Sequence, residues 1–558
     1  MAWPYVNGDI HIGHLVGYLL PADIFARFHR FRGNDVLMVS GSDCFGTPIT
    51  VEADKRKIKP QDIVNEYHAK NVALFKKLGL TFDNYTKTDT ENHKKIVQDF
   101  FLKLLEKDLI FKKTTKQYYS TEEKRFLPDR YVEGVCPHCG YAESRSDQCD
   151  KCGAVINEGE LKNPKSKLSG GEVVLKPTEH YFLDWQKLQK FLEKYVATNG
   201  NKWRQWVLDE TKGWLKKGLE ARAITRDLDW GVEIPIDKIP EDLQIDNVKN
   251  KRIYVWFDAV IGYLSASIEW TQRGLKQNKT QTNADTSWED WWKNKGAEHY
   301  YFMGKDNLIF HTLFWPGQLY SYDEKLHLPD ASIINQFLNL EGQKFSKSRG
   351  VTIASDYMAD TYGNDTLRFY LAMIMPENAD ASFDWTDFVA KNNNILIATI
   401  GNFINRAVTL AKGIDFQKAK IDSAIQKTIN DFLAEGINAL EKEHSFKKYA
   451  DAFARLADFG NKYITKEEPW AIKDGAKKTE VMSNAIALTI GLLVFFKPLM
   501  PDAYNNLSKQ LGVDIKIWDE KLDIQSLLRG VKISTTSPLF KKLDEGIIEV
   551  ERAKIKKL

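Results

Sequence analysis

The stretch Pro4–His14 constrains the fold of this chain more than any other. It opens with turn formers, Asp9 is a predicted N-cap, and apolar residues recur with helical spacing from His11 onward. His11 and His14 therefore fall in the first turns of a helix, where free backbone N–H groups and the positive end of the helix dipole attract phosphate. A helix that presents such a site is typical of an open α/β sheet.

Gly13, between the two histidines, lacks a Cβ, so a flat ligand such as an adenine base fits against the backbone. The pattern His-Ile-Gly-His alone is a weak signal, because a capped helix with two surface histidines has the same sequence. The chain contains neither a glycine-rich loop ending in Gly-Lys-Ser/Thr nor Gly-x-Gly-x-x-Gly after a strand. A P-loop or dinucleotide mechanism is therefore not predicted.

Length and charge bound the other possibilities. A chain of 558 residues exceeds what one hydrophobic core supports and predicts three or four domains. Its net charge of +3 means that a nucleic-acid partner must be held by local basic patches. We recognise no apolar run of membrane-spanning length and no secretory leader, so we expect a cytoplasmic protein without a membrane partner.

The first half of an α/β domain follows the histidine stretch. A β-rich run at 35–39 ends in Ser-Gly-Ser-Asp43, and helices are predicted at 49–59, 63–78 and 94–105. Because strands of open α/β sheets present ligand-binding groups at their carboxyl ends, Asp43 is a candidate for holding a substrate amine; capping of the next helix is the alternative. The first helix needs a strand before it, yet only three residues precede Pro4. We expect that this strand is missing or that the true start codon lies upstream.

Three further strands are predicted at 252–257, 298–303 and 332–338. If the chain turns into a helix after the first, one pocket wall consists of Trp256, Ala259, Val260 and Tyr263. Core packing is the alternative for Ala259 and Val260. The second strand ends in Gly304-Lys-Asp306, with His311 five residues later; a structural role is the alternative for this histidine.

Between the two halves lies a segment rich in Gly, Pro, Asp and Lys that carries paired Cys-x-x-Cys motifs. Its cysteines are Cys136, Cys139, Cys149 and Cys152. Four thiolates at this spacing suit one tetrahedral zinc ion, and with no open coordination position the metal is structural. Disulfide pairing is the alternative, disfavoured in a chain without secretory features.

A basic loop and a helical region complete the pattern. Lys344-Phe-Ser-Lys347-Ser-Arg-Gly350 places two lysines and two serines on a glycine-bounded loop, which suits a mobile cationic lid over a polyphosphate. Beyond residue 385, apolar residues step by three and four, and helices are predicted around 396–410 and at 425–440, 449–464 and 482–496. This spacing predicts an all-α domain.

Together, His11-Ile-Gly-His14 and Lys344-Phe-Ser-Lys-Ser348 resemble the two signatures of the class I aminoacyl-tRNA synthetases. Within the class, the chain is most similar over its whole length to the methionyl-tRNA synthetase family. Shared motifs include Pro4-Tyr-Val-Asn-Gly8, Tyr254-Val-Trp-Phe-Asp-Ala259 and Gly304-Lys-Asp-Asn307. The knuckle region, with Arg125-Phe-Leu-Pro-Asp-Arg130 before it, resembles the archaeal and eukaryotic branch.

The resemblance implies an α/β fold: a Rossmann-like doubly wound parallel sheet with a zinc-knuckle insertion, followed by an all-α anticodon-binding bundle. The implied segments are 1–115 and 231–335 as the two halves of the catalytic domain, 116–230 as the insertion, 336–385 as the KFSKS loop and stem-contact region, 386–525 as the anticodon-binding domain and 526–558 as a closing segment. Nothing in the sequence resembles the dimerisation domain appended in some relatives, so a monomer is expected.

The resemblance also implies activation of L-methionine by ATP, accompanied by Mg²⁺, and transfer of methionine to tRNA(Met), initiator tRNA included. Catalytic and ATP-binding roles fall to His11, Gly13, His14, Gly304, Asp306, Lys344 and Lys347. The methionine site would comprise Ala2, Trp3, Tyr5, Asp43, Trp256, Ala259, Val260, Tyr263, Asn307 and His311. Anticodon recognition would use Asn402, Arg406 and Trp470, which supply the donors and stacking planes that splayed bases need.

Relatives in the same branch often carry a second zinc knuckle. The corresponding positions here are Ser120, Glu123, Ser166 and Ser169, which do not suit zinc, so one metal ion is predicted. Two alternatives stay open: a non-catalytic tRNA-binding paralogue, or another class I synthetase. The leucine, isoleucine and valine enzymes need a larger editing insertion than residues 116–230 allow, and a cysteinyl enzyme would place its zinc ligands in the amino-acid pocket.

Overall fold

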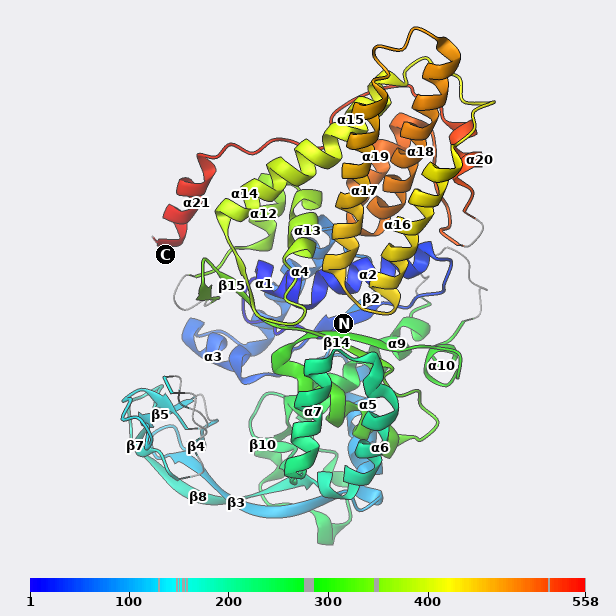
Figure 1. Cartoon of the computed structure of the whole chain (residues 1–558). Coiled ribbons are helices and arrows are strands. Elements are labelled where there is room, and N and C mark those ends of the chain that lie inside the picture. Colours follow the sequence, from blue (N-terminus) through cyan, green and yellow to red (C-terminus); the bar gives the residue numbers. More distant parts are fainter. Residues whose placement is uncertain are drawn as a thin grey trace.

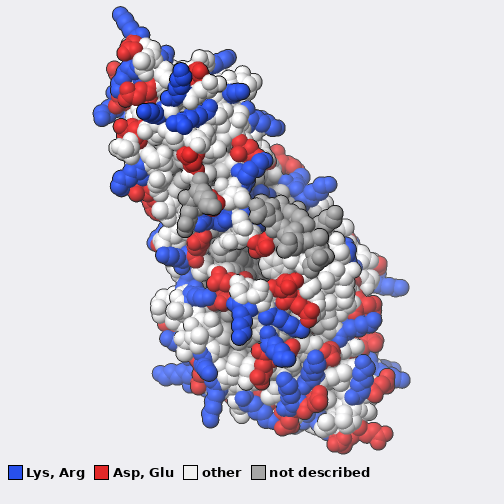
Figure 2. Space-filling model, turned by 90° about the vertical axis from the view of Figure 1, so that its right-hand side faces the viewer, with Lys and Arg blue, Asp and Glu red and all other residues white. Residues whose placement is uncertain are grey.

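The computed structural model describes residues 1–128, 131–146, 149, 151–152, 156, 159–274, 286–345, 351–519 and 522–556, with Lys344 and Lys556 described by their backbone alone. The protein is elongated (Figure 1): a helical bundle forms one end, an α/β body the middle, and a curved β-ribbon with a small knuckle the other end. Figure 2 shows Lys and Arg interspersed with Asp and Glu over the face in view, as expected for the small net charge.

Two pairs of parallel strands form the central sheet. They are β1 (Val39–Ser42) with β2 (Asn84–Lys87), and β13 (Tyr300–Gly304) with β14 (Ala331–Asn335). The segment 1–6 lies between β1 and β13: the amide of Ala2 donates to the carbonyl of Phe302 at 2.9 Å, and Tyr5 forms a parallel bridge with Asp43. Residues 1–6 therefore occupy the central position of the sheet without forming a regular strand. They fill, over this short length, the place of the strand that is expected before the first helix.

Helices cover both faces of the sheet. The first runs as α1 (Ile12–His14), a π-helical turn η1 (Leu15–Leu19) and α2 (Leu20–Phe31). The others of the first half are α3 (Thr47–Arg56), α4 (Pro60–Lys77) and α5 (Glu91–Glu106). The predicted strand at 35–39 is displaced, since β1 begins at Val39, its last residue.

The insertion is a long antiparallel ribbon that carries the knuckle. Strand β3 (Ile110–Ser120) pairs with β8 (Val173–Leu183) along its whole length. The edges are β4 (Arg125–Phe126) and β9 (Arg222–Ala223), and the knuckle sheet comprises β5 (Val132–Val135), β6 (Ser144–Arg145) and β7 (Lys162–Ser166). Helices α6 (Gln189–Asn199) and α7 (Gln205–Lys217) and the small sheet of β10 (Thr225–Asp227), β11 (Val232–Glu233) and β12 (Lys251–Ile253) return the chain to the body.

The strand predicted at 252–257 is only partly correct. Strand β12 ends at Ile253, and α8 (Val255–Asp258), a 3₁₀ turn (Ala259–Ile261) and α9 (Gly262–Gln272) follow. The amide of Tyr254 donates to the carbonyl of Ile224, and the amide of Phe257 donates to the carbonyl of Tyr254. The chain therefore turns here despite its β-forming residues. Next come α10 (Glu289–Trp292), a π-helical turn η10 (Phe310–Phe314) and α11 (Trp315–Tyr322).

After β14, a small sheet of β15 (Leu338–Leu340), β16 (Gln343–Lys344) and β17 (Ala381–Phe383) leads to the helical region. Its helices are α12 (Ser355–Tyr362), α13 (Asn364–Met373), α14 (Trp385–Lys391), a π-helical stretch η12 (Asn392–Gly401), α15 (Asn402–Leu410), α16 (Ser423–Glu441), α17 (Phe446–Glu467), α18 (Gly475–Leu499), α19 (Pro501–Leu511), α20 (Ile524–Gly530) and α21 (Ile547–Lys556). The predicted α/β fold with a helical carboxyl-terminal region is thus confirmed.

Helix α18 corrects one expectation from the sequence. It has the length and apolarity of a membrane span, with a mean hydropathy of 1.7 over its most apolar window, although no such run was recognised. Within the protein, 89% of that window is buried, and α18 packs against α2, α15, α16, α17, α19 and α20. Its uniform apolarity therefore fits the central helix of the bundle.

Candidate active site and tRNA-facing surface

The two signature histidines form a reciprocal cap at the start of the first helix. Nδ1 of His11 accepts a hydrogen bond from the amide of Gly13 at 3.1 Å, and Nδ1 of His14 accepts one from the amide of His11 at 3.2 Å. The N-cap is therefore His11 and not Asp9, which is exposed. Because each Nδ1 is an acceptor, we assign the proton of both neutral rings to Nε2.

Gly13 is held tightly under the His11 ring. A Cβ at this position would lie 2.9 Å from two atoms of that ring, so only glycine allows the cap. The same ring stacks on Phe345, with centroids 4.8 Å apart and planes 11° from parallel. The hairpin β15–β16 thus brings the start of the KFSKS loop next to His11; the backbone of Lys344 lies in β16, and Lys347 lies outside the described residues.

Asp43 lies where β1 ends and is only 4% exposed. Its amide donates to the carbonyl of Pro4 at 2.9 Å, which fixes it beside the 1–6 segment. Burial raises the pKa of its carboxyl to about 8, and a weak hydrogen bond from the Phe45 amide opposes the shift. The buried carboxyl of Asp258 also has its pKa raised, by burial and by the negative charge of Asp43. No cationic group acts on Asp43 among the described residues, so a cationic ligand would compensate its buried charge.

Aromatic side chains from three separate segments lie near Asp43. Trp3 lies 6.4 Å from Tyr263, and Tyr5 meets Trp256 edge-on at 6.5 Å between ring centroids. The hydroxyl of Tyr263 and Nε2 of His311 are 2.6 Å apart. Three glycines pack directly against these rings: Gly41 and Gly262 against Trp3, and Gly46 against Tyr5. A Cβ at any of them would clash with the ring. The predicted pocket residues therefore come together, including buried Ala259 and Val260, which also lie in the core.

Sequence reasoning missed part of this wall. Phe310 stacks on Trp256 with centroids 3.8 Å apart, and Tyr301 packs edge-on against Tyr263 at 5.0 Å. The position of Phe310 directly before His311 was the only available signal. At the end of β13, Gly304, exposed Asp306 and Asn307 follow as predicted, and the Asn307 carbonyl lies 2.9 Å from Nδ1 of His311.

The three residues predicted to recognise an anticodon lie at one end of the bundle. Arg406 on α15 lies over the ring of Trp470, 5.4 Å from its centroid, and Trp470 is 51% exposed just beyond α17. Asn402 lies one turn before Arg406 and contacts Asn461 at 3.2 Å. An exposed indole with a guanidinium over one face provides a platform for an unstacked base.

The four knuckle cysteines converge. Their sulfur atoms all lie within 4.8 Å of one another, with Sγ distances of 3.9 Å for Cys136–Cys152 and 3.7 Å for Cys139–Cys149. A disulfide needs about 2.05 Å, whereas a tetrahedron with Zn–S bonds of about 2.3 Å has edges of about 3.8 Å. The four thiols therefore fit a tetrahedral metal and form no disulfide.

The second knuckle is replaced by hydrogen bonds. The hydroxyl of Ser166 donates to Glu123 at 2.6 Å and accepts from the amides of Leu168 and Ser169, and Ser120 accepts from the Glu123 amide. The same two chain segments are thus held together without sulfur ligands.

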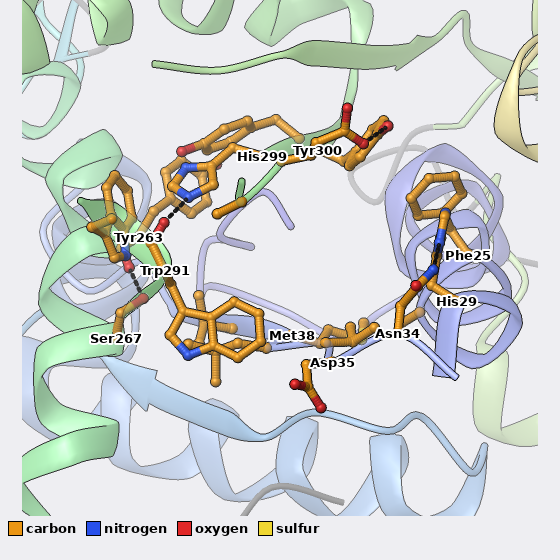
Figure 3. Close-up of a pocket in the computed structure, with 18 of the residues that line it drawn as sticks. Phe25, His29, Asn34, Asp35, Met38, Tyr263, Ser267, Trp291, His299 and Tyr300 are labelled. Carbon is orange, nitrogen blue, oxygen red and sulfur yellow. Dashed lines mark hydrogen bonds between the residues drawn. The ribbon is translucent and has the colours of Figure 1, made fainter. Parts of the chain in front are cut away.

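A further cavity lies elsewhere among the described residues. It has a volume of about 660 Å³ and shares only Tyr263 with the predicted sites. Figure 3 shows its lining residues arranged around an open centre, at the amino ends of β1 and β13 and hence at the opposite edge of the sheet from Asp43.

Comparisons with known proteins agree with the arrangement of the site. Residues 1–408 match the family profile described as tRNA synthetases class I (M), and residues 415–555 match the anticodon binding domain of methionyl tRNA ligase. A methionine–tRNA ligase of Dehalococcoides mccartyi (strain CBDB1) is 41% identical over 565 residues, covering 100% of this chain and 98% of the relative. One of Roseiflexus castenholzii is 39% identical over 595 residues, with the same coverage.

Among solved structures, the chain is similar to Mycobacterium tuberculosis methionyl-tRNA synthetase bound by methionyl-adenylate. The TM-score is 0.74 with 18% sequence identity, over 97% of this chain and 99% of the other. This likeness confirms the fold. With the family profiles and the full-length relatives, the resemblance seen in the sequence is confirmed, and the chain belongs to the methionine–tRNA ligase family of class I aminoacyl-tRNA synthetases.

Proposed function

We propose that this protein joins L-methionine to ATP, forming methionyl-adenylate and pyrophosphate, and then transfers the methionyl group to the 3′ end of tRNA(Met), initiator tRNA included. The observation that carries the proposal is the placement of Asp43 and the Gly304–Asn307 turn. They follow the parallel strands β1 and β13, whose carboxyl ends open on one edge of the sheet beside the histidine cap. Relatives that this chain covers over 98% of their length are methionine–tRNA ligases.

The chemistry needs positioning and charge stabilisation, and no covalent nucleophile from the protein. The methionine carboxylate attacks the α-phosphate in line, and pyrophosphate leaves with its electron pair. We assign the Nε2–H groups of His11 and His14 to the phosphate oxygens, and Lys344 and Lys347 to the leaving pyrophosphate. We assign Gly13 to the ATP site together with the two histidines, and Gly304 and Asp306 to the ribose. Mg²⁺ accompanies ATP as part of the substrate.

Methionine is assigned to the aromatic pocket. Asp43 pairs with its α-ammonium group, while its side chain lies among Ala2, Trp3, Tyr5, Trp256, Ala259, Val260, Tyr263, Asn307 and His311. The sulfur gains contact energy at the edges of these rings. We further propose a monomer that acts in the cytoplasm.

Amino-acid-dependent exchange of pyrophosphate into ATP tests the activity. We expect exchange with methionine alone among the twenty amino acids. Exchange with another amino acid would assign the chain to a different synthetase specificity, and absence of exchange with all twenty would favour a non-catalytic tRNA-binding protein.

Replacing Trp470 by alanine should separate the two halves of the reaction. The indole is exposed and contacts Arg406, so its loss removes a stacking plane without opening the core. One lost base stack costs about 1–3 kcal/mol, which lowers kcat/KM for tRNA charging by roughly 5- to 150-fold. Methionine-dependent pyrophosphate exchange should stay within twofold of the parent, and an equal loss in both assays would contradict the anticodon assignment.

We propose one structural zinc ion per chain, held by Cys136, Cys139, Cys149 and Cys152. Elemental analysis should return one zinc per chain, and Cys149→Ser should reduce this to near zero, because the site is closed by four thiolates. Glu123→Gln, in the hydrogen-bonded second site, is the matched control and should leave the zinc content at one. Two zinc ions per chain would contradict this assignment.

A further inference from the structure

Two consecutive residues of α21 contact the chain on both sides of the KFSKS loop. The hairpin β15–β16 leads into this loop, and α12 follows it. Arg552 pairs with Glu341 at the tip of the hairpin, whereas Glu551 accepts hydrogen bonds from the hydroxyls of Tyr357 and Tyr362 on α12. Figure 1 shows that a long extended segment joins α21 to the bundle, so these contacts and packing against α14 place the helix.

The tip of the hairpin is a tight turn of two residues. Glu341 and Gly342 have positive φ angles of 48° and 77°. A left-handed backbone is unfavourable for glutamate, so neighbouring contacts have to stabilise it. The Glu341 amide donates to the carbonyl of Phe383 at 2.9 Å, and the Gly342 amide donates to Oγ of Ser382 at 3.0 Å. The backbone of the tip is therefore fixed on β17.

The carboxylate of Glu341 is shared between two partners. Oε1 accepts a hydrogen bond from the amide of Trp385 at 3.0 Å, in the first turn of α14. Oε2 lies 3.2 Å from the guanidinium group of Arg552. The same guanidinium nitrogen lies 3.3 Å from Oδ2 of Asp384 and donates to Oγ1 of Thr386 at 3.1 Å. Arg552 thus joins the hairpin tip to the turn between β17 and α14.

The hairpin tip sets the direction of the strand that enters the active site. Only two residues, Gln343 and Lys344, follow the tip in β16. Phe345, the next residue, stacks on the His11 ring. Any rotation of this short strand about its tip moves the backbone of Lys344 and the ring of Phe345 relative to the histidine cap. Small displacements of this kind, caused far from the chemistry, are costly for catalysis.

Helix α21 has a second, separate anchor on α12. The carboxylate of Glu551 is only 5% exposed and lies 2.8 Å from both the Tyr362 hydroxyl and Nζ of Lys554. Apolar side chains of the same helix pack against the main core. Because these contacts do not involve the hairpin, α21 should stay docked when Arg552 is replaced.

We propose that Arg552 is a positioning residue for methionyl-adenylate formation, acting through Glu341. It holds the hairpin β15–β16 in the orientation that brings Lys344 and Phe345 next to the histidine cap. The inference rests on the proposed function, which assigns Lys344 to the leaving pyrophosphate. Replacing Arg552 should therefore affect the use of ATP and spare methionine, whose site is proposed in the aromatic pocket.

Pyrophosphate exchange with three variants tests this role. Arg552→Ala should lower kcat/KM for ATP about fivefold, as expected for the loss of one partly exposed ion pair, while KM for methionine stays within twofold. Arg552→Lys keeps a positive charge and should recover at least half of the loss. Asp384→Asn is the matched control: it removes the other carboxylate partner of Arg552, keeps an oxygen for the α14 cap and should stay within twofold of the parent.

A double-mutant cycle identifies the partner through which Arg552 acts. Glu341→Gln keeps an oxygen for the Trp385 amide and loses the charge that faces Arg552. It should show the same selective loss for ATP, and combining it with Arg552→Ala should add less than twofold to the larger single effect. Losses that multiply in the double variant would overturn the proposed route.

Hydrogen exchange provides a measurement that does not depend on activity. In Arg552→Ala, the amides of Glu341, Gly342 and Trp385 should exchange at least threefold faster, with the amides of α21 unchanged. Unchanged exchange at the hairpin with unchanged ATP kinetics would overturn the inference and leave the proposed function intact. Faster exchange along all of α21 would assign Arg552 to docking of the helix alone, and also overturn it.

The parent protein separates this inference from the proposed function. If the parent shows no methionine-dependent pyrophosphate exchange, the proposed function fails whatever the variants do. The hydrogen-exchange result then still decides whether Arg552 holds the hairpin.

Discussion

Asp43→Asn is expected to raise the KM for methionine by on the order of 100-fold or more. The carboxyl is buried, so a bound α-ammonium group relies on it as a counter-ion. Removing one partner of a buried ion pair costs about 3–5 kcal/mol, because the other charge stays uncompensated. At about 1.4 kcal/mol for each tenfold step, this is a loss of at least two orders of magnitude. Pyrophosphate exchange at increasing methionine concentration measures it.

The same substitution should stabilise the protein without substrate, which excludes misfolding as the cause. Burial raises the pKa of Asp43 from its ordinary value near 3.8 to about 8. Between these two values the folded state keeps a proton that the unfolded state releases, so stability falls as pH rises, by roughly 1.4 kcal/mol per pH unit. Asparagine does not titrate. The gain in melting temperature should therefore be larger at pH 8 than at pH 6.

The pH dependence of methionine binding provides a further check. In the parent, affinity should increase as pH rises toward about 8, since less free energy is spent ionising Asp43. Burial and the negative charge of Asp43 also raise the pKa of the Asp258 carboxyl. The increase should vanish in the Asn variant. An unchanged pH profile in that variant would assign the titration to another group and contradict Asp43 as the amine ligand.

The residues that could be predicted from the sequence are those whose geometry is local. The Cys-x-x-Cys spacing fixes how four sulfur atoms meet, and they do meet within 4.8 Å. The His11-x-Gly-His14 spacing likewise places both rings in one turn. The sequence predicts Asp9 as the N-cap of this helix, because aspartate is a common N-cap residue. In the structure the N-cap is His11, whose Nδ1 accepts the hydrogen bond from the amide of Gly13.

What could not be predicted depends on contacts between distant segments. Trp256 lies in a run of β-forming residues, yet it belongs to helix α8, since it and its neighbours contact residue 224, residue 310 and the amino terminus. Helix α18 has the length and apolarity of a membrane span, and only its packing partners show that it is the central helix of the bundle. Tertiary burial decides each of these cases.

His14→Asn is expected to slow methionyl-adenylate formation by about 100- to 1,000-fold, the usual cost of removing one donor from a developing negative charge. The asparagine carbonyl can replace Nδ1 as acceptor of the His11 amide, so the helix cap is kept while the Nε2–H donor is lost. His14→Gln is the matched control, since its longer side chain restores a donor near Nε2 at the expense of the cap.

Comparing these two variants distinguishes chemistry from structure. If the Nε2–H group stabilises the phosphate, the Gln variant should be at least tenfold faster than the Asn variant in single-turnover assays. The Asn variant keeps the cap and should therefore melt at the higher temperature. If His14 acts only through the cap, the order reverses: Asn should be the faster enzyme, because its backbone hydrogen bond survives. The rates and melting temperatures of the pair must therefore run in opposite directions for the proposed role to hold.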